Sequence, residues 1–421
     1  MARRHISPLI NIGTFILFVH VMKRSSMKGA LKRSEELGTR GALAVLSVLA
    51  TVGALVGIAP AAHAASTLVV PRDYRTIQAA VDAAASGDTI LVRGGTYTEE
   101  VVVSGKDLNL KGVGKGSPVI KSPTTLTPFA QDLRHDVPVT SVVRIADGAH
   151  VHMSGFTVTG PVPCGQLASG ITALQSSSLD LSRSRVIDML PAPSCPADQA
   201  FGRGVTIGLP DFIQVDGTAG SPASGRITHV RVTRYQTDGF NLNGPSEGTP
   251  SQVVAKSNVV TGGARIPTVQ AGIIVGGAVA TVTGNLVSDA VCTFPGCGGD
   301  PTNEYQSSGI AAIGAAPGTQ ISQNRVSDTD IGIYQVFSPN CCQISHNRLT
   351  DNRFFGIAIQ DGDGTTAHNE ITGGQVGIGV IADAVDTTGI LRGDRIRRPS
   401  VAPVREIQCC GFRATAVVKP S

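Results

Sequence analysis

The sequence predicts an all-β fold, a single-stranded right-handed parallel β-helix with three strands per coil and an N-terminal capping helix. Three observations indicate this fold. The first is composition: aromatic residues make up only 4% of the 421-residue chain and tryptophan is absent, whereas glycine occurs 50 times. A narrow solenoid filled with stacked Ile, Val and Leu needs few large side chains. The other two observations are a repeated Gly-apolar pair and a repeated Asn marker.

The Gly-apolar pair recurs at spacings of 34, 35, 33, 37, 23, 24 and 21 residues. A period in the low twenties, with extra length in some units, is typical of a solenoid. The segments between the pairs are short and β-branched, so each unit is predicted to hold three short strands. The pairs begin at Gly170, Gly204, Gly239, Gly272, Gly309, Gly332, Gly356 and Gly377.

The second marker has the form Asn-x-apolar-Ser/Thr-Asp/Gly. Asn tolerates left-handed backbone geometry and its amide can bond the backbone, so we expect it at a sharp turn. In stacked coils the amides would also bond one another as a ladder. The alternative fold, a β-sandwich, would need five markers in register by coincidence. The markers begin at Asn258, Asn285, Asn324, Asn347 and Asn369.

Residues 1–64 are predicted to be a secretory signal peptide with a start-site extension. Residues 41–59 are apolar, basic residues precede them, and a small-x-small cleavage site follows at residues 62–64. An uncleaved anchor is the alternative, because the apolar run nears membrane-spanning length. Cleavage predicts a secreted protein with no membrane attachment.

The mature chain is expected to be nearly neutral. Eight of the 35 Lys and Arg and two of the 31 Asp and Glu lie in residues 1–64, which leaves 27 basic and 29 acidic residues. The basic excess therefore belongs to the export signal and is no argument for a nucleic-acid partner. We expect a monomer with one repeat domain over residues 65–390 and an irregular segment or cap at residues 391–421.

A short amphipathic helix is predicted over residues 76–85. Ile77, Ala80, Val81 and Ala84 share one face of this helix. Laid across the open end of a solenoid, such a helix would hide the core of the first coil.

Eight cysteines all follow the signal segment, and an even count in an exported chain predicts disulfides. Eight cysteines allow 105 connectivities. Cys292–Cys297 is a candidate local staple, and Cys164–Cys195 is a candidate pair between stacked loops. Zinc is the rival interpretation. The chain has no Cys-x2-Cys pair and no spaced His beside these cysteines, so no metal site is predicted from them.

The segments TIQAAVDAA and GDTILVRGGTYTEEVVV resemble the N-terminal stretch of pectin methylesterases and of many other proteins in the pectin lyase-like superfamily. The Gly-Ile and Asn repeats are similar to the parallel β-helix repeat of that superfamily. The resemblance covers roughly residues 67–390. It implies the fold and a polysaccharide partner, pectin or a uronate-like glycan. It does not fix an activity, because the superfamily includes lyases, hydrolases, esterases, epimerases and non-enzymatic proteins.

The catalytic motifs of these relatives are incomplete here. Asp-Phe-Ile at residues 211–213 resembles a pectin methylesterase motif, but it sits in a Gly/Pro/Ser-rich stretch, and the Gln-Asp-Thr and Gly-Arg-Pro-Trp motifs are missing. Gln-Thr-Asp-Gly at residues 236–239 is similar to the Asn-Thr-Asp-Gly motif of polygalacturonases. Their inverting mechanism needs a second acid, which the next coil lacks. A turn-capping carboxylate is the alternative role for Asp238.

Strand alternation places the residue after each Gly-apolar pair on the outer face of its sheet. None of these positions is charged: Thr172, Thr206, Asn241, Ile274, Ala311, Tyr334, Ala358 and Gly379. Chemistry would therefore come from strand starts and long loops, such as 208–225, 243–251, 261–271 and 290–308. The candidate catalytic residues are Asp238, Asp300 and Glu304. The candidate substrate-binding residues are Asn241, Asn243, Tyr334 and Gln360.

Two classes of function stay open at this point. One is an enzyme acting on extracellular polysaccharide, either a polysaccharide lyase or a glycoside hydrolase. Calcium is then a candidate cofactor, because Asp361 and Asp363 could begin a calcium loop, although the Gly and Thr residues that follow favour a solvated turn. The other is a non-catalytic carbohydrate-binding or cell-surface structural protein. A role in maturing a copper centre finds no His/Met cluster to support it.

Overall fold

The computed structural model describes residues 64–196, 199–263, 268–293, 295–300, 302 and 304–420. The predicted signal peptide lies outside these residues. The chain from Ala65 onward forms one compact unit, which consists of strands and one short helix in its described part. In that part no helix has the length and apolar character needed to span a bilayer.

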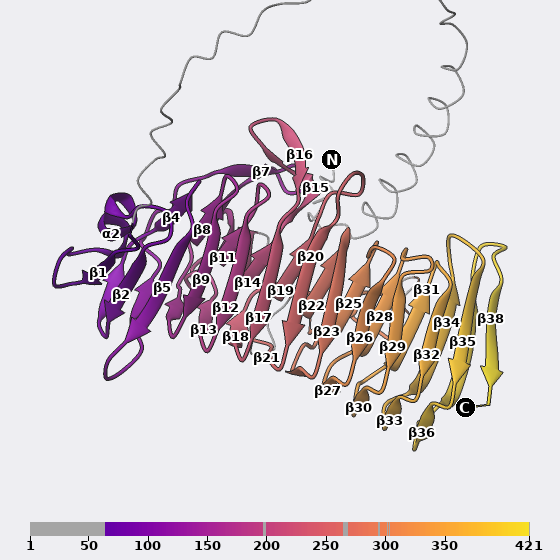
Figure 1. The fold of residues 1–421 in the computed structure, drawn as a ribbon. Coiled ribbons are helices and arrows are strands. Elements are labelled where there is room, and N and C mark those ends of the chain that lie inside the picture. Colours follow the sequence, from indigo (N-terminus) through magenta and orange to yellow (C-terminus); the bar gives the residue numbers. More distant parts are fainter. Residues whose placement is uncertain are drawn as a thin grey trace, which may run out of the picture. The chain divides into compact units, whose positions relative to one another are not determined.

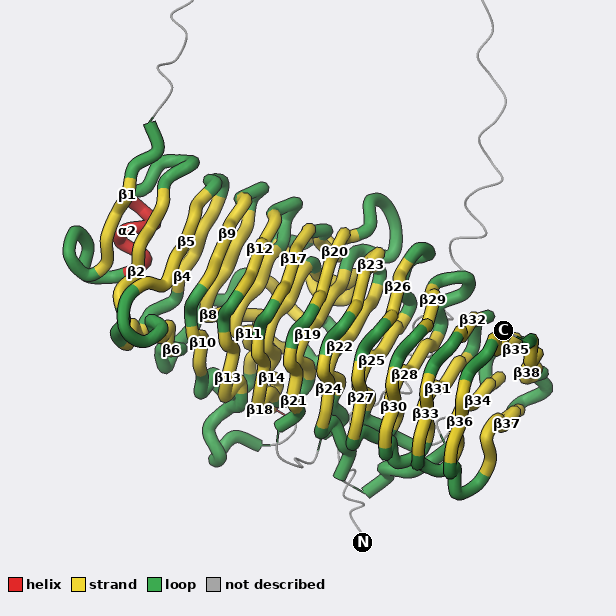
Figure 2. Tube along the Cα trace, turned by 60° about the horizontal axis from the view of Figure 1, so that its bottom comes forward, coloured by secondary structure: helices red, strands yellow, loops and turns green. Residues whose placement is uncertain are grey.

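Three sheets of parallel strands run side by side along this unit, and most coils contribute one strand to each sheet (Figures 1 and 2). The right-handed parallel β-helix is therefore confirmed. Sheet A consists of β1 (Thr67–Val70), β2 (Thr89–Arg93), β5 (Leu108–Val113), β9 (His150–Ser154), β12 (Ser178–Ser182), β17 (Ser224–Thr228), β20 (Ser251–Lys256), β23 (Ala278–Thr283), β26 (Thr319–Ser322), β29 (Cys342–Ser345), β32 (Gly364–Ala367), β35 (Thr387–Arg392) and β38 (Ala414–Lys419).

The Gly-Ile strands belong to sheet C, and the strands after each Asn belong to sheet B. Sheet B consists of β3 (Thr96–Thr98), β6 (Val119–Lys121), β10 (Thr157–Thr159), β13 (Arg185–Met189), β18 (Arg231–Tyr235), β21 (Val259–Thr261), β24 (Leu286–Ser288), β27 (Arg325–Ser327), β30 (Arg348–Thr350), β33 (Glu370–Thr372) and β36 (Arg395–Arg397). The parallel strands of sheet C are β4 (Val101–Ser104), β8 (Val137–Ala146), β11 (Gln166–Ala173), β14 (Ala200–Ile207), β19 (Asp238–Asn243), β22 (Ala271–Gly276), β25 (Ser308–Ile313), β28 (Ile331–Val336), β31 (Phe355–Gln360), β34 (Val376–Ala382) and β37 (Ala402–Gln408).

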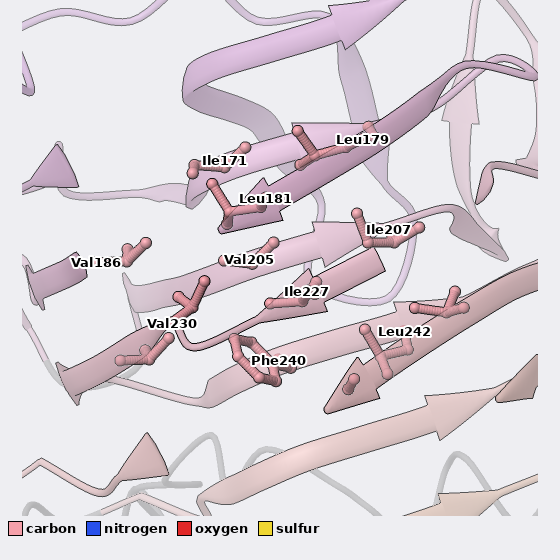
Figure 3. Packing of buried hydrophobic residues seen from close by; sticks show 14 of the residues in the cluster. Ile171, Leu179, Leu181, Val186, Val205, Ile207, Ile227, Val230, Phe240 and Leu242 are labelled. Atoms are coloured by element: carbon pink, nitrogen blue, oxygen red, sulfur yellow. The ribbon is translucent and has the colours of Figure 1, made fainter. Parts of the chain in front are cut away.

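One apolar core fills the space between the sheets. Each coil repeats the inward residues of the coil before it, so like side chains stack in columns. On sheet C, for example, Val205 pairs with Phe240, which pairs with Ile273. Figure 3 shows these inward side chains from successive coils packed against one another. The core is narrow, which explains why so few aromatic residues are needed.

The Gly of each Gly-apolar pair is required by close approach between coils. At Gly272, an added Cβ would overlap Val287 Cγ1 from sheet B and lie 2.6 Å from the carbonyl oxygen of Gly309 in the next coil. Gly272 does not have a positive φ. The repeat therefore marks the corner where sheets B and C meet, and only a residue without a Cβ fits there.

The Asn ladder forms as predicted. Asn324 donates from Nδ2 to Asn347 Oδ1 at 3.0 Å, and its own Oδ1 accepts from Asn285 N and Nδ2 at 3.0 and 2.9 Å. The ladder ends at Asp394, whose Oδ1 accepts both N–H groups of Asn369. The amide hydrogen bonds expected of Asn are present, but the left-handed backbone expected at Asn is not. The left-handed residue of each turn is the one before the Asn, as His346 and His368 show with φ of 56°.

The two ends of the solenoid differ. Helix α2 (Ile77–Ala83) buries Ile77, Ala80 and Val81 against the first coil, as predicted. Thr76 caps the helix, and the Glu99 carboxylate accepts the first two helical N–H groups. At the other end, residues 391–421 were expected to be an irregular segment or a cap, and they are not irregular. These residues form β36, β37 and β38, one further coil, because the apolar rhythm continues in a weaker form.

A covering layer that the sequence did not predict lies on sheet C. β7 (Ala130–Asp132), β15 (Leu209–Val215) and β16 (Thr218–Ser221) are antiparallel and project beside the first coils (Figure 1). A second apolar cluster joins the layer to sheet C through residues such as Ile213, Leu167 and Phe201. The interpretation of residues 208–225 as a loop is therefore wrong, and Asp211 lies in a strand.

All eight cysteines are paired. Cys164–Cys195 and Cys292–Cys297 form as the candidate pairs predicted. The other two disulfides join sequence neighbours, at residues 341–342 and 409–410. Each of these two disulfides lies in the connection between a sheet C strand and the following sheet A strand.

Candidate functional site

A polar cluster lies on the outer face of sheet C, in strands β14 and β19. Arg203 Nε lies 2.8 Å from Asp238 Oδ2, and each side chain is 8% exposed. Asn241 Nδ2 donates to the same carboxylate oxygen at 2.8 Å, and Asn243 Nδ2 donates to Asn241 Oδ1. We call these four residues the Arg203 cluster. Its members are fixed to one another, so their polar groups are preorganised.

This cluster corrects the expectation of an uncharged outer face. The prediction considered only the residue after each Gly-apolar pair. The residue before the Gly faces outward too, and parallel pairing places Arg203 directly beside Asp238. The outward column also continues into coils beyond those considered, where Arg144 pairs with Thr172 and Arg405 pairs with Gly379.

The covering layer brings a second charged group towards the Arg203 cluster. Asp132 is fully buried at the end of β7, where its carboxylate contacts His135 Nδ1 at 2.9 Å and accepts the Arg134 backbone N–H at 2.9 Å. Burial alone would raise the pKa of Asp132. The His135 hydrogen bond and the Arg134 charge outweigh burial and lower this pKa to about 2. Arg134 lies close enough to Arg203 and Asp238 to interact with both charges.

The loop that follows β19 is bonded to the covering layer. The residues 243–251 connect β19 to β20, and the Ser246 backbone N–H in this loop donates to both carboxylate oxygens of Asp211 at 3.3 and 3.1 Å. Asp211 thus ties the loop to β15. The Arg134 and His135 side chains of the covering layer are 33% and 22% exposed.

A second polar cluster is formed by residues in and directly after strands β28, β31 and β34 of sheet C. Tyr334 donates its hydroxyl to Gln360 Oε1 at 2.6 Å. Asp361 is buried and its Oδ1 accepts three consecutive backbone N–H groups, beginning with that of Asp383 at 2.8 Å. We call Tyr334, Gln360, Asp361 and Asp383 the Asp383 cluster. Asp361 is thus a buried turn cap, which corrects the solvated-turn interpretation, whereas Asp363 is exposed.

Asp383 has the electrostatic character of an acid. Its pKa is raised, first by partial burial and then by the negative charges of Asp361 and Asp300. A carboxyl with a raised pKa beside other carboxylates is the arrangement that general acids require. The Cys409–Cys410 disulfide borders this cluster, with Cys410 Sγ 4.0 Å from Asp383 Oδ1.

Five of the seven predicted site residues separate into two groups. Asp238, Asn241 and Asn243 join the Arg203 cluster, and Tyr334 and Gln360 join the Asp383 cluster. Asp300 contributes only its charge to Asp383, and Glu304 folds back to accept the Asp300 backbone N–H at 2.8 Å. Two further residues, Arg203 and Asp383, carry chemistry that the sequence did not single out.

The described part of the chain holds one group of side chains that could in principle bind a metal ion. One group of potential ligand atoms lies within 4.8 Å of one another, from Asp383, Cys409 and Cys410. Both cysteines are in a disulfide and offer no thiolate. Asp361 Oδ1, which could have served calcium, is occupied by three backbone N–H groups.

The chain therefore has the fold of the right-handed parallel β-helix proteins. No family model matches the sequence, and no curated protein matches it. Two structures of the GH136 lacto-N-biosidase from Eubacterium ramulus are similar, with TM-scores of 0.56 and 0.53 at 11% identity over 79% of this chain. A family 28 exopolygalacturonase from Yersinia enterocolitica is 10% identical over 85% of this chain and 78% of its own, with a TM-score of 0.49. The chain spans only 63% and 62% of the lacto-N-biosidase chains, and at this identity the likeness is one of fold.

Proposed function

We propose that this protein is exported and binds an extracellular polysaccharide on the outer face of sheet C, with the Arg203 cluster as its main contact. The observation that carries the proposal is the fixed series of a guanidinium, a carboxylate and two amides across two coils. A few preorganised polar groups of these kinds, set on a rigid sheet, suit the hydroxyl-rich surface of a sugar. Two similar structures are named as a lacto-N-biosidase, an enzyme of carbohydrates, and the proposal extends a carbohydrate ligand to this chain.

Binding fits the Arg203 cluster better than hydrolysis does. Glycoside hydrolysis uses one carboxyl as a proton donor and a second carboxylate across the bond. Asp132 has a pKa of about 2 and is fully buried, so it donates no proton at neutral pH. The Asp238 carboxylate is paired with the Arg203 guanidinium and accepts a hydrogen bond from Asn241, which favours its charged form. Export is supported by the four disulfides, which persist in oxidising compartments.

Affinity electrophoresis in gels containing polygalacturonate, alginate or xylan, with and without calcium, tests the proposal. We expect at least one polymer to retard the protein. Asn241→Ala and Asp238→Asn should each lower the affinity for that polymer, obtained from the retardation, about tenfold, since each removes a charged or buried hydrogen bond. Gln320→Ala, an exposed change on sheet A, is the matched control. Equal retardation of all variants, or none on any polymer, would contradict the proposal.

The Asp383 cluster supports a second candidate, an acid-catalysed cleavage of the same class of polymer. The specific observation is the raised pKa of Asp383 beside Asp361. Assays for new reducing ends and for unsaturated products on the same polymers distinguish hydrolysis from elimination. We expect Asp383→Asn to abolish any product while leaving retardation on the gels unchanged. No product from the unaltered protein, with or without calcium, excludes this candidate.

A further inference from the structure

A separate pocket lies on the outer face of sheet C, at β4 and β8. Its volume is about 290 Å³, near the lower end of the usual range for small-ligand sites. Val102 and Arg144 form the floor, as paired residues of the two strands. Phe129, which precedes β7, and Asp216, which follows β15, line it from the covering layer. The pocket is therefore built by the same inserted segments that cover the neighbouring coils.

Arg144 is the residue of the pocket that indicates a ligand. Its Nε atom is buried and has no hydrogen-bond partner, while its guanidinium lies 5.0 Å from the centre of the Phe129 ring. A buried donor without an acceptor costs free energy, because the water it lost on folding has not been replaced. The Nε atom is too buried to be reached from the pocket, but Arg144 lines the pocket and its terminal guanidinium nitrogens can donate to a ligand oxygen there. The Phe129 ring beside it offers an apolar surface next to the polar one.

The other polar groups decide the charge of that ligand. Asp147 and Asp216 both line the pocket, and Asp147 accepts the Ser104 hydroxyl. One guanidinium and two carboxylates give the lining a net negative charge. A ligand carboxylate would be repelled by both aspartates, whereas hydroxyl groups can donate to them and accept from Arg144. The lining therefore favours a neutral ligand with several hydroxyls around an apolar ring face.

From this lining we propose that the pocket binds one neutral sugar ring, with Arg144 donating to its oxygens and Asp147 and Asp216 accepting from its hydroxyls. The site is distinct from the Arg203 cluster, which lies on β14 and β19. It does not depend on the polymer that sheet C holds elsewhere, and it selects against acidic sugars. A pocket of this size suits a chain end or a side branch rather than the middle of a chain.

The experiment compares sugars that differ only at C6, where a carboxylate replaces the hydroxymethyl group. Saturation-transfer NMR and calorimetry with the purified full-length protein would use galactose against galacturonate, and glucose against glucuronate. We expect at least one neutral sugar to bind about tenfold more tightly than its acidic counterpart. Binding of the acidic member as tightly or more tightly, or no binding of either neutral sugar, would overturn the proposal.

Two variants test whether the sugar binds in this pocket. Arg144→Gln should weaken binding of the neutral sugar by about tenfold or more, because it removes a charged donor. Asp216→Asn changes an exposed turn residue and leaves folding intact, so it tests the pocket even where Arg144→Gln does not fold. Asp216→Asn should lower the affinity for the neutral sugar and raise the affinity for the acidic sugar. Gln320→Ala is again the control, and thermal unfolding checks each fold. Unchanged affinities in Asp216→Asn would place the ligand elsewhere.

Discussion

The Asn324 side chain takes part in four hydrogen bonds inside the solenoid, and the residue is fully buried. Its Nδ2 donates to Val282 O and to Asn347 Oδ1, and its Oδ1 receives two N–H groups of Asn285. Asn324→Ala leaves buried backbone groups without partners, at about 1–3 kcal/mol each. We expect a loss of about 3 kcal/mol in the free energy of unfolding, measured by urea denaturation. Gln320→Ala should cost less than about 0.5 kcal/mol. Equal costs for the two variants would show that the ladder contributes nothing.

Asp132 makes stability depend on pH at the acid end. Its folded pKa of about 2 lies below its unfolded value of 3.8, so the carboxylate stabilises the fold above pH 4 and loses this effect as pH falls towards 2. The shift corresponds to about 2 kcal/mol. Asp132→Asn should therefore lower the melting temperature at pH 7 and scarcely at pH 2. Asp136→Asn, on the exposed turn nearby, is the control. A melting temperature difference that is the same at both pH values would contradict this assignment.

Residue by residue, the sequence could place some of the Arg203 cluster and not the rest. Asp238 stood next to a Gly of the repeat, and Arg203 stands in the same place one coil earlier. Aligning the residues before each Gly would have paired them, because parallel strands in register bring equivalent positions together. Asp132 and His135 offer no such signal. They lie in an insertion without a period, and only the folded layer brings them near.

Among the elements, the Gly-Ile strands depend on contacts that a single methyl group would break. Gly272→Ala places a Cβ against Val287 and the Gly309 carbonyl, and the neighbours are backbone or packed core. Overpacking of this kind costs about 1–3 kcal/mol. Gly95→Ala is the matched control, since its nearest neighbour would be the Tyr97 ring at 3.6 Å. Chemical denaturation should show a loss for the first variant only. A loss of the same size in both would point to glycine flexibility rather than to close approach.

The elements that the sequence predicted are those that repeat. Three strands per coil, the ladder and the capping helix followed from periodic positions, because every coil meets the same neighbours. The covering layer did not follow. Residues 208–225 are rich in Gly, Pro and Ser, which favours a loop, yet Ile213 and Val215 find an apolar partner surface on sheet C. Tertiary contact overrides local preference there.

At the scale of the whole molecule, both open ends of the solenoid must avoid pairing with other chains. The last strands carry charge at their exposed edge, with Arg395 and Arg397 in β36 and Glu406 in β37. The first coil has no comparable charges and relies on α2, whose Ile77, Ala80 and Val81 are buried in the common core. The N-terminal end is therefore the one whose protection a single substitution can remove.

Val81→Asp should convert the protein into associating species. A carboxylate in place of a side chain that is 2% exposed cannot stay in the core, so α2 detaches and uncovers the apolar first coil and the edge of β1. Light scattering after gel filtration should show oligomers that grow with concentration. Ala79→Asp makes a similar change on the exposed face of the same helix and should leave the elution unchanged. Monomeric Val81→Asp with an intact circular dichroism spectrum would mean that the first coil is stable without its cap, and that the edge of β1 is protected by another feature.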